Sequence, residues 1–144
     1  MDPEIEPLVR DAIHAAVIRD FDVLDERLQA LPAGEPTARA VELTTALVYL
    51  IMIDIHNGKP TEEEIRGVAA EIARGEAWAA PTAEEVTSYL VRLLNGQPFG
   101  TEVPSENVVI LAFVCAANLL SSCHRDDEEW WDYLDRAEAA LEAA

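Results

Sequence analysis

The residues best suited to recognise another molecule lie near the end of the chain, where a tryptophan stands among carboxylates. Glu128 and Asp135 are the helical neighbours of Trp131, one turn before and one turn after it. A large aromatic side chain within a charged rim is typical of protein–protein interfaces. The pattern predicts a partner-binding surface on the last helix, formed by Trp131, Glu128, Asp132, Asp135 and Glu138.

The charge of the chain favours a basic partner for this surface. The 144 residues include 28 acidic and 10 basic side chains, for a net charge of −18, and carboxylates are densest in residues 126–142. Such a field accelerates association with basic molecules. We therefore expect a non-catalytic interaction protein, of the inhibitor or immunity type, that binds a basic protein. Solubility is an alternative reason for the acidity, whereas nucleic acids and anionic membranes need a basic footprint that this chain lacks.

A second group of residues predicts a different function, the binding of a small molecule inside a helical bundle. Asn118 and Asp54 are polar residues in otherwise apolar segments, and a buried amide or carboxylate without a partner costs about 1–3 kcal/mol. These side chains either bond between helices or line a pocket. In the second case Asn118, Asp54, Tyr49 and Cys115 would line a site for a small apolar or metal ligand, with enzymatic activity as an option, and residues 95–104 would form its lid.

The familiar motifs of metal sites and nucleophilic enzymes are absent from the sequence. Cys123, His124, Asp126 and Asp127 are the densest set of metal-ligand types, but their spacing matches no standard site. Cys115 and Cys123 are about 12 Å apart along one predicted helix, which is too far for a disulfide. Reduced cysteines and an N-terminus without a secretory pattern predict a cytoplasmic protein. We expect no cofactor and no metal.

Two apolar segments must position all of these residues. Residues 108–120 are apolar at every position but one, and residues 43–55 are nearly as apolar. A helix without a polar face is buried on all sides, and both segments are shorter than the roughly 20 residues that span a membrane. The sequence predicts an all-α fold, a compact bundle of six or seven helices around these two. Residues 1–144 are expected to form a single domain, and a homodimer built on exposed apolar stripes is an open alternative.

Local signals mark the ends of the outer helices. Thr61 with Glu64, and Thr82 with Glu85, match the capping-box pattern. Residues 3–31 form one helix or two, because the acidic side chains near positions 20–22 could cap a second helix. The last helix is predicted to start at position 126 or 127, with the carboxylates that follow in its positive first turn.

Overall fold

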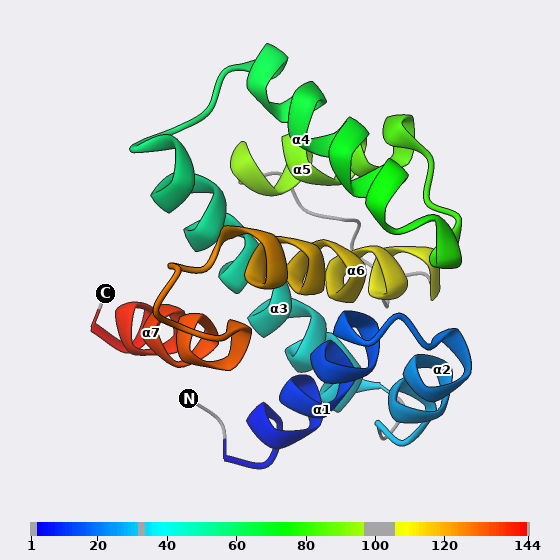
Figure 1. Cartoon of the computed structure of the whole chain (residues 1–144). Helices are drawn as coiled ribbons and strands as arrows, with labels where there is room; N and C mark the ends of the chain where they lie inside the picture. The colour runs from blue at the N-terminus through cyan, green and yellow to red at the C-terminus, as the bar shows by residue number, and fades with distance from the viewer. Residues whose placement is uncertain (1–2, 32–33, 97–105, 144) are drawn as a thin grey trace.

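Helix α6 (Glu106–Cys123) runs through the middle of the computed structural model, with the other helices around it (Figure 1). The structure describes residues 3–31, 34–96 and 106–143, and within these ranges every regular element is helical. The remaining elements are α1 (Glu6–Val17), α2 (Phe21–Gln29), α3 (Glu35–His56), α4 (Glu62–Gly75), the 3-10 helix η1 (Ala77–Ala79), α5 (Ala83–Leu94) and α7 (Trp130–Ala143). The predicted all-α bundle is confirmed.

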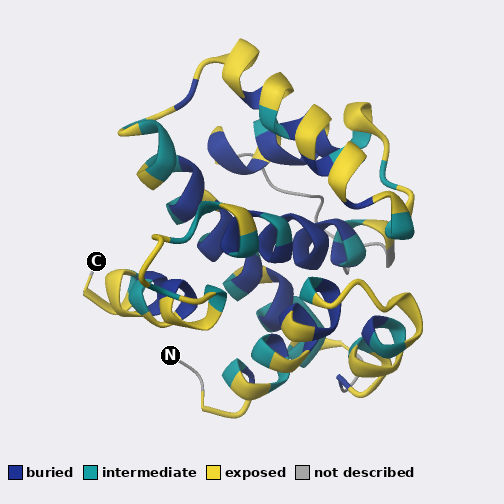
Figure 2. Ribbon diagram, in the orientation of Figure 1, coloured by how far each residue is buried: buried dark blue, intermediate teal, exposed yellow. Residues whose placement is uncertain are grey.

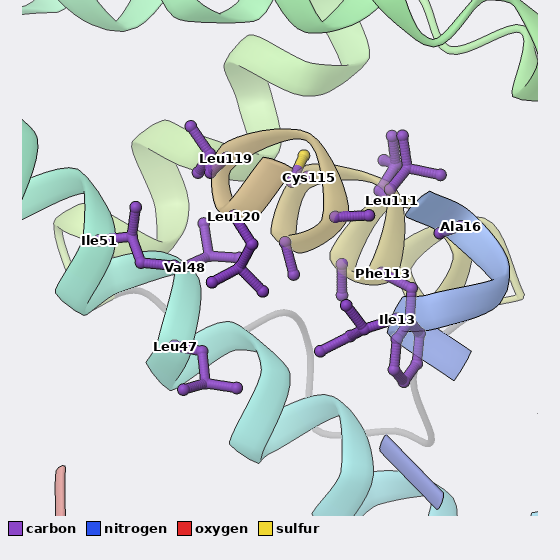
Figure 3. Packing of buried hydrophobic residues seen from close by; sticks show 14 of the residues in the cluster. Ile13, Ala16, Leu47, Val48, Ile51, Leu111, Phe113, Cys115, Leu119 and Leu120 are labelled. Carbon is purple, nitrogen blue, oxygen red and sulfur yellow. The ribbon is translucent and has the colours of Figure 1, made fainter. Parts of the chain in front are cut away.

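The two apolar segments form the centre of the bundle, as predicted. Helices α6 and α3 pack against one another, and α1 covers α6 from a second direction. Figure 3 shows side chains of all three helices meeting in the core, with Phe113 from α6, Leu47 from α3 and Ile13 from α1 among them. None of these three exposes any surface to solvent, at 0% each. Figure 2 shows how the buried stretch follows α6, while the outer helices are exposed on their far sides.

The outer helices form two groups on opposite sides of α6. Helices α4 and α5 pack together above it in the view of Figure 1, and α1, α2 and α7 lie below it. No helix in the described part of the chain is long and apolar enough to cross a membrane. The predicted lid, residues 95–104, lies outside the described residues from position 97 onward.

The predicted caps explain where several helices begin. The side chains of Thr61 and Thr82 each accept a hydrogen bond from the backbone N–H three residues on, which closes both capping boxes. The first segment breaks in two, since Arg19 adopts φ 59° and the Asp20 carboxylate caps α2 by accepting from the Val23 N–H at 3.1 Å. The bundle has seven α-helices within the described residues because of this break.

The predicted start of the last helix is wrong by three or four residues. Helix α7 begins at Trp130, and its N-terminal turn is closed by Asp132, whose carboxylate accepts from the Glu129 N–H at 2.9 Å. Glu128 instead stays in the preceding turn, where its carboxylate accepts from the Arg125 N–H at 2.9 Å. A turn held in this way leaves the carboxylates at positions 126–129 outside the helix.

Candidate interaction surface

Three of the five residues predicted to bind a partner face solvent. Trp131 is 47% exposed, and Asp132 and Asp135 are exposed beside it. Trp131 and Asp135 lie one turn apart and share a face of α7. Further exposed carboxylates stand at positions 126, 127 and 129 in the turn before the helix. The start of α7 therefore presents an aromatic side chain together with dense negative charge.

Glu128 stabilises the turn instead of facing a partner, which corrects the prediction. Its carboxylate accepts a hydrogen bond from the Arg136 guanidinium at 2.7 Å, and only 12% of its side chain is exposed. Hydrogen bonds from Arg136 and from the Arg125 backbone hold the pKa of Glu128 below its ordinary value. The guanidinium also lies 4.3 Å from the centre of the Tyr133 ring. Glu128 thus holds the turn that leads into α7, directly before Trp130 and Trp131.

Glu138 is buried between α7 and α1, so its predicted place on the exposed face is wrong. The Arg10 guanidinium donates to Glu138 at 2.8 Å, to Asp135 at 2.7 Å and to Glu6 at 2.7 Å. The second carboxylate oxygen of Glu138 is buried and has no hydrogen-bond partner among the described residues. Burial and the nearby Glu6 raise the pKa of Glu138 to about 7, although Arg10 opposes the shift. These four residues, Arg10, Glu6, Asp135 and Glu138, form an ionic cluster that joins α7 to α1, and we call it the α1–α7 cluster.

Aromatic rings join the same two helices. The Trp130 ring stacks on the His14 ring of α1, with centroids 5.9 Å apart and planes 14° apart. Trp131 meets Trp130 edge to face, with centroids 5.7 Å apart, an arrangement that aromatic pairs prefer. The sequence around His14 does not predict this contact, because it depends on how two helices far apart in the chain pack together. The exposed aromatic surface therefore extends from α7 onto α1.

The four residues of the alternative pocket are not brought together. Asp54 is exposed on α3 and accepts a hydrogen bond at 2.8 Å from a tyrosine of α7, while Tyr49 is 44% exposed. Cys115 is fully buried in α6, where burial raises the pKa of its thiol. Asn118 donates to the buried carboxylate of Glu76 at 3.1 Å. Asn118 thus bonds between segments of the bundle, which was the other interpretation of its position.

Asp54 and Asn118 line two different hollows. A hollow of about 220 Å³ between α3 and α7 includes Asp54, and one of about 550 Å³ along α4 and α6 includes Asn118. Each hollow is lined in part by exposed residues. In the part of the chain that the structure describes, no three His, Cys, Asp or Glu side chains gather into a metal-binding group.

Comparison with known proteins offers no relative for this arrangement. The chain matches no protein-family model, no curated protein and no solved structure. Its function must be argued from the exposed surface itself. We call it the surface around Trp131. It consists of Trp131 and the exposed carboxylates of Asp126, Asp127, Glu129, Asp132 and Asp135, and the contact with Trp130 holds Trp131 in place.

Proposed function

We propose that this protein is a non-catalytic acidic interaction protein that binds a basic protein partner through the surface around Trp131. The exposure of Trp131 among carboxylates is the observation that carries the proposal. Tryptophan is enriched at the centres of binding interfaces, where it forms anchors that contribute most of the affinity. The proposed role is that of an inhibitor or immunity protein, which binds its partner and covers part of the partner's surface.

The cations beside this surface do not cancel its negative field. Arg10 faces the three carboxylates of the α1–α7 cluster, and Arg136 pairs with Glu128. Arg125 is exposed in the turn itself, but four carboxylates follow it at positions 126–129. The exposed carboxylates at Asp126 and Asp127 add to the field at the start of α7. Lysine and arginine side chains of a partner would therefore be attracted to the tryptophan from a distance.

Reversing two of these charges is expected to slow association. The partner would be captured at low salt, released at high salt and purified, and its association rate measured by stopped-flow fluorescence. Asp126→Lys combined with Asp127→Lys should lower the rate constant about tenfold at low salt and much less at high salt, because exposed charges act through a screened field. Glu138 is unsuitable for this test, since its reversal would place a second cation beside Arg10 in the α1–α7 interface.

The matched control reverses two exposed carboxylates on the opposite side of α6, Glu63→Lys with Glu84→Lys. It makes the same change in net charge but leaves the surface around Trp131 intact. We expect this control to slow association less than threefold, as a rough estimate from screening. An equal effect of the two double variants would show that net charge alone matters and would contradict the proposal.

A further inference from the structure

The surface around Trp131 is one end of a longer line of apolar and aromatic side chains. We call it the aromatic band, and it consists of Trp131, Trp130, His14, Ile18, Phe21 and Trp78. We infer that the whole aromatic band docks one amphipathic basic helix of the partner protein. The inference rests on the proposed function and deepens it by stating the form of the partner.

Neighbouring members of the aromatic band are joined either by a ring contact or by three to four residues of chain. Ile18 follows His14 by one helical turn, with the Ile18 N–H donating to the His14 carbonyl at 3.0 Å, and it is 54% exposed. Phe21 comes three residues later, after the turn into α2, and is 42% exposed. Its ring meets the ring of Trp78 on η1 edge to face, with centroids 6.4 Å apart. The band therefore runs over α7, α1, α2 and η1, with Ile18, Phe21 and Trp131 exposed and Trp130 and Trp78 partly buried against the core.

The distribution of exposed apolar residues supports one continuous surface. Ile18, Phe21 and Trp131 are three of the four exposed large hydrophobic residues in the described part of the chain, and Tyr49 on α3 is the fourth. All three tryptophans of the sequence also belong to the band. Single exposed apolar residues are ordinary on a protein surface, but gathered ones mark interaction sites.

Buried polar contacts hold the far end of the band in place. The carboxylate of Glu76 is 2% exposed and accepts from the Trp78 indole N–H at 3.0 Å and from the Asn118 amide at 3.1 Å. The guanidinium of Arg19, in the turn between α1 and α2, lies 3.5 Å from the same carboxylate. The α1–α7 cluster around Arg10 fixes the near end. A surface fixed in advance loses little freedom on binding.

Charge determines which occupant fits the aromatic band. Asp11, Asp22 and Asp135 are exposed carboxylates within one turn of band residues on three different helices. They outnumber the exposed Arg19, which follows Ile18 and whose guanidinium lies 3.5 Å from the Glu76 carboxylate. A second copy of this chain would bring another net charge of −18 against the first, which repulsion opposes. An amphipathic helix places apolar side chains on one face and lysine or arginine beside them. Its apolar face would cover the band while its cations reach the flanking carboxylates.

The test uses a synthetic 18-residue helical peptide with leucine on one face and lysine on the other, and a scrambled peptide of the same composition. Tryptophan emission follows binding, because every tryptophan of the chain lies on the band. Ile18→Ser and Phe21→Ser should each weaken binding on the order of tenfold, as expected for truncating an interface anchor. Tyr49→Ser is the matched control, of similar exposure and off the band, and should change binding less than twofold.

The outcomes separate this inference from the proposed function. If Trp131→Ser weakens peptide binding while Ile18→Ser and Phe21→Ser behave like Tyr49→Ser, the extended band is wrong and the proposed function stands. If the partner protein responds to neither Trp131→Ser nor the reversals at Asp126 and Asp127, both are wrong. Equal binding of the scrambled peptide, or no binding of either peptide at low salt, also overturns the amphipathic-helix inference. Thermal unfolding of each variant confirms that it is folded.

Discussion

Replacing Phe113 by alanine is expected to lower the free energy of unfolding by about 3–5 kcal/mol, the range observed for buried phenylalanines. Phe113 is 0% exposed on α6, where α1 and α3 pack against the helix. Its removal would leave a cavity in the segment on which the fold depends. Since the free energy of unfolding of a small domain is only about 5–15 kcal/mol, this single substitution would remove a large part of the stability of the protein.

Urea unfolding followed by circular dichroism measures this loss. Phe113→Leu is the control, because it retains most of the apolar volume, and it should cost about 1 kcal/mol. A loss for Phe113→Ala no greater than that for Phe113→Leu would mean that α6 does not occupy the packed centre of the bundle.

Replacing Arg10 by alanine is the second large change, with an expected loss of about 2–3 kcal/mol at pH 8. Removing one member of a buried ion pair leaves its partner uncompensated and costs 3–5 kcal/mol when burial is complete. The expected loss is smaller here because 31% of the Arg10 side chain is exposed. Glu138, whose side chain is 11% exposed in the intact protein, would lose the guanidinium that contacts it at 2.8 Å.

The loss caused by Arg10→Ala should grow as pH rises from 5 to 8. Burial raises the pKa of Glu138 from its ordinary 4.5 to about 7 in the folded protein. The folded state therefore binds the Glu138 proton more tightly than the unfolded state does. The contribution of this protonation to stability is complete below pH 4.5 and is lost as pH rises through 7. At pH 5 a protonated Glu138 has little need of Arg10, whereas at pH 8 the carboxylates of Glu6, Asp135 and Glu138 repel one another without it.

Thermal and urea unfolding at the two pH values measure this difference. Arg66→Ala is the matched control, because Arg66 makes an exposed ion pair with Glu62 at 2.9 Å. Pairs of this kind contribute roughly 0–1 kcal/mol, so the control should show a small loss at both pH values. A loss for Arg10→Ala that stays constant or shrinks toward pH 8 would contradict the account of the α1–α7 cluster.

The fold could be predicted from the sequence because its strongest signals are local. Residues 108–120 and 43–55 contain too few polar groups to lie anywhere but the centre, which α6 and α3 confirm. The capping residues Thr61 and Thr82 act within one turn of their own helices, so no knowledge of packing was needed. The start of α7 could not be placed in the same way. Glu128 had a good position for a helix start, but its pairing with Arg136 holds it in the turn.

The candidate surface was only partly predictable because pairing across helices decides which charges remain exposed. The spacing of Trp131 and Asp135 is a property of α7 alone, and their exposure follows from the helix position. Glu138 follows Trp131 by two helical turns and is therefore expected on the same face of α7. Its carboxylate nevertheless pairs with Arg10 of α1 and is buried in the interface between the two helices. Likewise, Phe21 and Trp78 meet only through the packing of α2 beside η1. Such contacts join residues that are distant in the chain and leave no periodic signal.

Oxidative footprinting of the protein with the leucine–lysine helical peptide tests most directly whether the surface around Trp131, with the rest of the aromatic band, is the binding site. Side chains that the peptide covers should react more slowly with hydroxyl radicals. We expect protection of Trp131 and Phe21, with Tyr49 on α3 reacting at the same rate in the free and bound protein. Protection of Tyr49 while Trp131 stays fully reactive would show that the peptide binds elsewhere and that the surface around Trp131 is not the binding site.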